Sequence, residues 1–237
     1  MLPLEHITVV AVEQAVAAPF ATRHLADLGA RVIKIERPDG GDFARGYDAA
    51  VNGLSSHFVW LNRTKESLTL DLKRPEASTV MSRLLDRADV FVQNLAPGAA
   101  SRLGMAAADL HARYPRLIVC DISGYGSSGP YANEKAYDLL VQSEVGLVSI
   151  TGSEAEPAKA GVSVADIAAG MYTYSGILAA LVARAERTGH DRRSFAVRRA
   201  VGVDGIRRVL HRLQRIAAAA DRRPSRLDRA IRAISHT

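Results

Sequence analysis

The stretches ITVVAV (residues 7–12) and RVIKIE (residues 31–36) decide the fold of this chain. Each is a short apolar run, which is typical of a strand buried in a sheet. Between them, residues 19–28 carry apolar side chains at helical spacing, and Gly29 follows as a stop signal. The apolar face of this predicted helix consists of Phe20, Leu25 and Leu28. A strand, a helix and a strand within about thirty residues predict a parallel strand pair joined by a right-handed crossover.

The same alternation of strands and helices continues to residue 123. Strands are predicted at residues 67–72, 88–94 and 116–123, and helices at 73–85, 99–103 and 106–113. Residues 43–66 are mixed and polar, which predicts a long excursion over the surface. The whole pattern predicts an α/β fold, a Rossmann-like open parallel sheet with helices on both faces.

The loops of this predicted sheet exclude some common ligands. No G-x-G-x-x-G follows residues 7–12, which argues against a nicotinamide or flavin dinucleotide. Residues 124–130 (GYGSSGP) are rich in glycine but lack the Lys-Ser/Thr of a P-loop. After this loop the sequence predicts a helix from Lys135 to about Val145. A long apolar helix follows over residues 163–187, ended by Gly189.

Asp166 is the chemically most informative residue of the long helix, because it is a carboxylate at the helix start among small side chains. The helix dipole and the free N–H groups there would stabilise the anion, and an ionised carboxylate can act as a nucleophile toward an activated acyl group. Ser163-x-x-Asp166 also fits a capping box, in which Asp166 only accepts backbone hydrogen bonds. Spacing alone favours the capping box, because capping is commoner than catalysis.

Composition bounds the setting of the protein. Of its 237 residues 48% are hydrophobic, which suits a globular domain with a sizeable core. The lone Cys120 lies in a predicted strand, so an internal disulfide is excluded and a reducing cytoplasm is expected. The N-terminus lacks the pattern of a secretory signal. The longest apolar stretch, residues 167–183, is interrupted by Ser175 and two glycines, so no membrane span is expected.

Positive charge is concentrated at the end of the chain. Residues 191–237 hold 13 Arg and 4 Asp with no Lys or Glu, a balance of +9, so the preceding 190 residues carry −3 of the total +6. The predicted division is therefore an α/β domain over residues 1–190 and an Arg/Ala-rich tail over 191–237, helical or disordered. Residues 206–216 have helical spacing of apolar side chains, so the tail could form a short amphipathic helix. Nucleic acid is a disfavoured partner, because the tail carries no recognition motif.

Six stretches in one order resemble class III CoA-transferases, the family of formyl-CoA transferase and carnitine CoA-transferase. The resemblance covers about residues 4–189. The six stretches are residues 31–42 (RVIKIERPDGGD), 70–73 (LDLK), 94–104 (NLAPGAASRLG), 124–130, 161–170 and 176–181. Family members are substantially longer and continue after about residue 190 into a further domain. Since residues 191–237 match nothing in the family, the expectation is a truncation or frameshift that impairs activity.

The resemblance implies acyl-CoA:carboxylate CoA transfer in which Asp166 is the nucleophile and forms an aspartyl-CoA thioester. Acyl-CoA and a carboxylic acid are the implied substrates, with no metal. The implied CoA contacts are Gln14, Ala15, Arg37, Leu70, Asp71, Leu72, Lys73, Asn94, Leu95, Ala96, Arg102, Lys135, Ala136, Tyr137 and Asp138. Four separate cations suit the phosphates of CoA, namely Arg37, Lys73, Arg102 and Lys135. The three leucines could flank adenine or the pantetheine arm, or be core residues at strand ends.

The sequence leaves other interpretations open. α-Methylacyl-CoA racemases resemble this family but carry a His where this chain has Tyr137, before Asp138. Tyr is a poor base near neutral pH, so transfer is favoured over racemisation. A non-enzymatic α/β fragment with a basic arm is a further alternative. The family forms homodimers of interlocked chains, and a chain of this length is expected to lose that arrangement.

Overall fold

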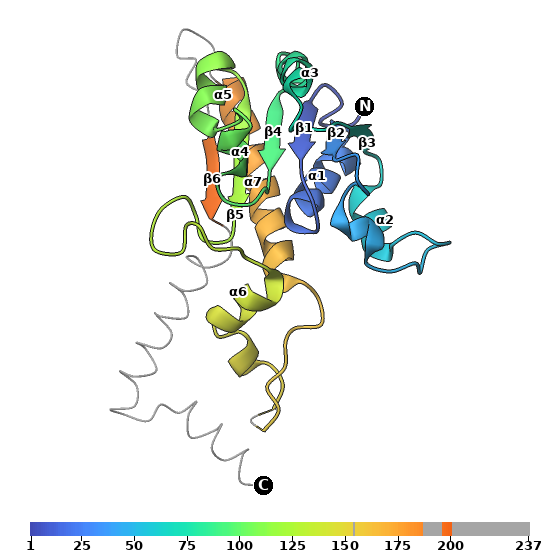
Figure 1. The fold of residues 1–237 in the computed structure, drawn as a ribbon, viewed down its shortest axis with the longest axis vertical. Helices are drawn as coiled ribbons and strands as arrows, with labels where there is room; N and C mark the ends of the chain where they lie inside the picture. Colours follow the sequence, from blue (N-terminus) through green and yellow to red (C-terminus); the bar gives the residue numbers. More distant parts are fainter. Residues whose placement is uncertain (154, 187–195, 201–237) are drawn as a thin grey trace.

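A computed structural model describes residues 1–153, 155–186 and 196–200 (Figure 1). It contains a six-stranded sheet in the order β3-β2-β1-β4-β5-β6, with every neighbouring pair parallel. The strands are β1 Thr8–Val12, β2 Arg31–Glu36, β3 Glu66–Thr69, β4 Val90–Gln93, β5 Ile118–Ser123 and β6 Ala196–Ala200. This is the strand order of a doubly wound fold, so the predicted fold class is confirmed.

Helices cover both faces of the sheet. On one face lie α1 (Ala17–Asp27) and α7 (Val164–Glu186), whose apolar residues pack with Val9, Val92 and Cys120 of the sheet. On the other face lie α3 (Pro75–Leu85) and α5 (Ala107–Arg113), which pack against the alternate strand residues such as Val10 and Phe91. Strand side chains alternate between faces, so a strand buried on both sides reads as a continuous apolar run. That is why these strands were visible in the sequence.

The remaining helical segments lie in the connections. These are the 3₁₀ turn η1 (Phe43–Gly46), α2 (Ser56–Asn62), α4 (Ala99–Arg102), α6 (Asp138–Glu144) and the 3₁₀ turn η2 (Val148–Ile150). Figure 1 shows α6 set apart from the sheet, close to the start of α7. Helix α2 lies within the predicted surface excursion and was missed, although the Ser55 hydroxyl accepts from the Phe58 N–H as a regular N-cap. Its Leu61 is completely buried, so tertiary packing stabilises this short helix.

The long helix α7 packs closely against α1. A Cβ added to Gly170 would lie 2.8 Å from the carbonyl oxygen of Ala17 and 2.8 Å from the Phe20 ring, so glycine permits this close approach. By length and composition α7 could also cross a membrane. One face of it is buried here, with Thr173 and Ile177 fully inaccessible, as in the core helix of a folded domain.

The described part of the tail differs from the expected helix or disorder. Residues Ala196–Ala200 form β6, which pairs with β5 in the register Val119↔Ala196 to Ser123↔Ala200. Parallel pairing satisfies the otherwise open edge of β5 with backbone hydrogen bonds, which depend little on side-chain composition. The predicted helix at residues 206–216 and the stop at Gly189 lie outside the described residues. The division of the chain at residue 190 therefore stays a prediction.

Candidate active site

The site is organised where the strand order reverses, between β1 and β4. Ligands of open α/β sheets bind in the crevice at the carboxyl ends of the strands at this point. Gln14 follows β1, and Asn94 follows β4. The Gln14 N–H donates to Asn94 Oδ1 at 3.0 Å, and Asn94 Nδ2 donates to the Gln14 carbonyl at 2.8 Å. Two predicted CoA contacts that are 80 residues apart are thus brought together, and each fixes the other.

Ala15 continues this loop in an unusual backbone conformation. Its φ is 62°, in the left-handed region that a residue with a Cβ rarely adopts. The Ala15 N–H donates to Asp42 Oδ1 at 2.9 Å. Asp42 is buried and lies in the connection after β2, so the turn of residues 14–15 is held from two neighbouring strand ends. Side chains, not further backbone pairing, therefore fix the shape of this turn.

Asp166 lies in the first turn of α7, beside this loop. The next residue, Ile167, packs against Val16, Phe20 and Leu61. Burial, and after it the negative charges of Asp42 and Asp166, raise the pKa of the Tyr47 phenol. Asp42, Tyr47 and Asp166 therefore share one electrostatic environment next to the turn of residues 14–15.

Asp138 caps α7. This corrects two expectations from the sequence, namely the capping box of Ser163 and Asp166 and the stabilised anion of Asp166. Asp138 Oδ1 accepts from the Ala165 N–H at 2.9 Å and from the Asp166 N–H at 3.4 Å. In a capping box, the Asp166 N–H would donate to the Ser163 hydroxyl. Here that N–H donates to Asp138, the first residue of α6. Asp138 is in turn held by Gln142, whose Nε2 donates to Oδ2 at 2.6 Å. Gln142 is fully buried and also accepts from the Ala160 N–H at 2.9 Å, so one pair of side chains ties α6 to the segment before α7.

Asp166 consequently does not have the stabilised anion that its position at a helix start suggested. Burial, followed by the negative charge of Asp138, raises the pKa of the Asp166 carboxyl from 3.8 to about 6. Burial disfavours the charged form, Asp138 adds a like charge, and Asp138 also accepts from the amides that could have stabilised the Asp166 anion. At neutral pH the carboxylate is still mostly ionised, yet it is poorly solvated. An anion in that state is more reactive than one stabilised by hydrogen bonds.

The four predicted phosphate-binding cations are exposed and lie after different strands. Arg37 follows β2; its Nε donates to the Gly41 carbonyl at 2.7 Å, and its guanidinium lies 4.6 Å from the centre of the Phe43 ring. Lys73 follows β3, Arg102 ends α4, and Lys135 precedes α6. Among the described residues, no direct contact joins these cations to Asp166. Because each cation follows a different parallel strand, the four are separate from one another, which suits a long polyanion such as CoA.

The other predicted contacts have mainly local roles in the structure. Leu70, Leu72 and Leu95 are half-buried against the core on the α3 and α5 side, as strand-end core residues would be. Asp71 Oδ1 accepts from the Lys73 N–H at 3.0 Å and so shapes the turn after β3. The last residues of the set lie at the surface or in loops: Ala96 and Tyr137 are exposed, and Ala136 is half-buried. A Cβ added to Gly124 would lie 2.0 Å from the Ala136 Cβ. The loop before α6 therefore packs directly against the residue that follows β5.

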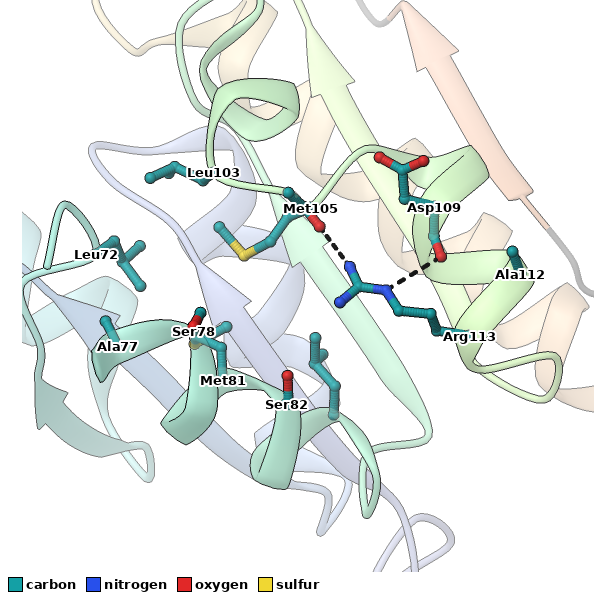
Figure 2. Close-up of a pocket in the computed structure, with 12 residues that line it drawn as sticks. Leu72, Ala77, Ser78, Met81, Ser82, Leu103, Met105, Asp109, Ala112 and Arg113 are labelled. Atoms are coloured by element: carbon teal, nitrogen blue, oxygen red, sulfur yellow. Dashed lines mark hydrogen bonds between the residues drawn. The ribbon is translucent and has the colours of Figure 1, made fainter. Parts of the chain in front are cut away.

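A cavity of about 500 Å³ lies between α3 and α5 (Figure 2). Leu72, Met81, Leu103 and Met105 give it an apolar lining. Arg113 closes one side, where it donates to the Gly104 and Asp109 carbonyls. The cavity begins next to the predicted CoA contacts after β3 and is on the face of the sheet opposite α7. It is therefore a separate feature from the surroundings of Asp166.

Sequence reasoning missed the charged residues beneath the loop: Glu13, Lys34, Asp42 and Lys65. Their side chains are 0–2% exposed. One signal was available, because Lys34 interrupts the apolar run of residues 31–36, and a charge in a buried strand needs a partner. For metal, no group of three or more His, Cys, Asp or Glu side chains suited to a cation occurs within the described part of the chain.

Comparison with known proteins agrees with this fold and shows the family. A family model described as CoA-transferase family III matches residues 4–193, and the chain belongs to that family. Succinyl-CoA:glutarate CoA-transferase of Mus musculus is 39% identical over 191 residues, 80% of this chain and 44% of the mouse protein. Succinate–glutarate CoA-transferase of Agrobacterium fabrum is 40% identical over 195 residues, 79% of this chain and 48% of that protein. The chain thus spans about half the length of the curated relatives it matches.

Solved structures give the same answer. A CaiB/BaiF family protein from Brucella suis superposes with a TM-score of 0.82 at 33% identity, over 95% of this chain and 60% of that one. A protein from Mycobacterium tuberculosis described as hypothetical superposes with a TM-score of 0.79 at 32% identity, over 95% and 61% of the two chains. The predicted family is confirmed, while the roles of individual site residues stay predictions.

Proposed function

We propose that this chain supplies the CoA-binding and nucleophile-bearing part of an acyl-CoA:carboxylate CoA-transferase, with Asp166 as the nucleophile. The observation that carries the proposal is the state of Asp166: a half-buried carboxylate with a pKa raised to about 6, beside the loop that follows β1, where the strand order reverses. Membership of CoA-transferase family III supports acyl-CoA as the substrate class. The cytoplasm, where acyl-CoA and carboxylic acids are both present, is the proposed setting.

The proposed reaction proceeds through covalent intermediates. An Asp166 oxygen attacks the thioester carbonyl carbon, and the carbon–sulfur bond breaks. The products are a mixed anhydride between Asp166 and the acyl group, and the free CoA thiolate. The thiolate attacks the Asp166 carboxyl carbon of this anhydride, which releases the donor acid as a carboxylate and leaves an aspartyl-CoA thioester. The acceptor carboxylate then reverses both steps and departs as its CoA thioester. No proton is gained or lost overall, so Asp166 must begin the cycle ionised.

The environment of Asp166 suits the first of these steps. Burial removes part of the water that would solvate the carboxylate, and the like charge of Asp138 disfavours the anion further. Attack on the thioester moves the Asp166 charge onto the departing thiolate and relieves both penalties. Water must be kept from the anhydride and thioester, since both hydrolyse. The half-buried position of Asp166 limits that access.

Several relatives are named for short acids, although one from Mycobacterium tuberculosis is named for fatty acyl-CoA, and we extend the short-acid class to this chain. Besides succinate and glutarate, an Acetobacter aceti relative, 39% identical, is named for acetyl-CoA and oxalate. Such acids need room for little more than one or two carboxylates near Asp166. Arg37, Lys73, Arg102 and Lys135 would bind the phosphates of CoA, and the turn of residues 14–15 would lie near its thioester end.

Retention on immobilised CoA followed by chemical trapping tests the proposal. Incubation with succinyl-CoA and then borohydride or hydroxylamine should modify one carboxyl, located at Asp166 by peptide mass analysis. Asp166→Ala should abolish trapping and keep CoA retention. The matched control is Asp86→Asn, which changes an exposed carboxylate at the end of α3 and should leave both intact. Trapping that survives Asp166→Ala would remove Asp166 from the mechanism.

Racemisation at the carbon next to the thioester is the alternative reaction. A carboxylate with a pKa near 6 could serve as one base, but the neighbouring Tyr137 is 66% exposed and cannot readily serve as the other near neutral pH. The two reactions differ in isotope exchange. Racemisation would exchange the α-hydrogen of a branched acyl-CoA with solvent deuterium, whereas CoA transfer leaves that hydrogen in place.

A further inference from the structure

Four completely buried charges lie beneath the turn of residues 14–15, and we call them the buried ionic cluster. Its members are Glu13, Lys34, Asp42 and Lys65. Two are positive and two negative, so the cluster is neutral overall. Burying a charge is costly unless it is paired and hydrogen-bonded, and apolar residues of similar size often serve a core equally well. The cluster therefore calls for a reason beyond stability.

Both lysines of the cluster have well-placed acceptors. Lys34 Nζ donates to Asp42 Oδ2, donates to Asn62 Oδ1 at 2.8 Å, and lies 3.8 Å from Glu13 Oε1. Lys65 Nζ donates to Glu13 Oε1 at 2.7 Å, to the Pro19 carbonyl at 3.0 Å and to Asn62 Oδ1 at 3.3 Å. With its hydrogen bonds satisfied in this way, the cluster specifies one arrangement of the segments that carry it.

Asp42 links the cluster to the candidate site. While Oδ2 accepts from Lys34, Oδ1 accepts from the N–H groups of Ala15 and Ala44, each at 2.9 Å. The Asp42 N–H donates to Glu36 Oε2 at 3.0 Å, which fixes the carboxylate from its own backbone. The Ala15 conformation at φ 62° is costly for a residue with a Cβ, so it persists only where its surroundings enforce it. Asp42 provides that enforcement.

We propose that Asp42, held by Lys34, is a positioning residue that keeps the Gln14–Ala15 turn in the shape that receives acyl-CoA. This rests on the proposed function, because it assigns the turn to CoA binding. Neither Asp42 nor Lys34 touches the substrate; both act through the backbone of Ala15. The cluster provides a rigid, charge-balanced base for a strained turn at the point where the strand order reverses.

The test combines Asp42→Asn with Ala15→Gly. Asn keeps the size of Asp42 but removes the charge opposite Lys34, so CoA affinity should fall about tenfold and the melting temperature should fall as well. Glycine adopts positive φ without strain. In the Asp42→Asn background, Ala15→Gly should therefore recover at least about a threefold part of the lost affinity while the melting temperature stays low. A residue that only stabilised the core would show no such rescue.

Calorimetric CoA binding and thermal unfolding are measured for the wild type, both single variants, the double variant and the Asp86→Asn control. The inference is overturned if Asp42→Asn lowers the melting temperature yet keeps CoA affinity within twofold, or if the double variant binds no better than Asp42→Asn. Should Asp42→Asn fail to fold, hydrogen exchange of the Ala15 amide in the wild type decides, since an unprotected amide would overturn the inference. A wild type that binds no CoA would refute the proposed function, whereas Ala15 exchange would still report whether Asp42 holds the turn.

Discussion

Replacing Asp166 by Asn should stabilise the fold at neutral pH and leave its stability unchanged in mild acid. The reason is the raised pKa of this carboxyl, about 6 instead of 3.8. An acid with a raised pKa in the folded state destabilises that state when it ionises. The protonated Asp166 carboxyl favours the folded state. This contribution to the free energy of unfolding is fully present below pH 4 and is lost as the pH rises through about 6. Asn is neutral at every pH, so the variant does not lose stability in this pH range through residue 166.

The size of the effect follows from the same pKa. A tenfold change in proton affinity corresponds to about 1.4 kcal/mol, so a pKa raised from 3.8 to about 6 gives about 3 kcal/mol for a fully enclosed group. Asp166 is half-buried, and water screens part of the penalty. We therefore expect Asp166→Asn to raise the free energy of unfolding by about 1–2 kcal/mol at pH 7.5 and by about zero at pH 4.

Urea unfolding of the wild type and the variant at half-unit steps from pH 4 to 8 measures this difference. Contributions of the other ionisable groups cancel in the comparison, and Asp86→Asn serves as the control, with a difference near zero throughout. A difference that is flat with pH, or that favours the wild type as the pH rises, would refute the reasoning. In that case Asp166 would be solvated or hydrogen-bonded as an ordinary helix-start carboxylate.

Three further predictions follow from the described contacts. Gly170→Ala should lower the free energy of unfolding by about 1–3 kcal/mol, because its Cβ would meet the Ala17 carbonyl, whereas Gly46→Ala, in open space, should change it little; urea unfolding compares the two. Burial and then the charge of Asp138 raise the pKa of Asp166, so Asp138→Asn should lower it in part, and the pH below which trapping at Asp166 slows should move from about 6 toward lower pH; a midpoint that stays fixed would show that burial alone sets it. Arg37→Ala should weaken CoA binding about three- to tenfold and reduce its salt dependence, measured by calorimetry against Arg87→Ala on an exposed surface; equal affinities would remove Arg37 from the binding site.

The sequence predicted the frame of the molecule because the strands are buried on both faces. A strand enclosed by two layers of helices reads as an unbroken apolar run, so β1, β2, β4 and β5 were found within one or two residues. Helix α3 was predicted from Lys73 to about Leu85 and is observed as Pro75–Leu85, with Pro75 in its first turn as expected. The short helix α2 was missed because seven residues are too few to show a helical period, and its apolar residues Phe58–Leu61 are consecutive and not spaced along one face. Strand β6 was missed because pairing with β5 is a backbone interaction with little sequence signature.

The sequence alone determined the family, the doubly wound sheet and the presence of a carboxylate at the start of a long helix. Each of these depends on local pattern or on the order of short motifs along the chain. Only the tertiary structure decided that Asp138 from α6 caps that helix, that burial and the Asp138 charge leave the Asp166 anion poorly stabilised, and that Asp42 holds Ala15. The reason is physical: a pKa and a strained turn depend on which groups approach from distant segments, and chain folding alone brings those groups together.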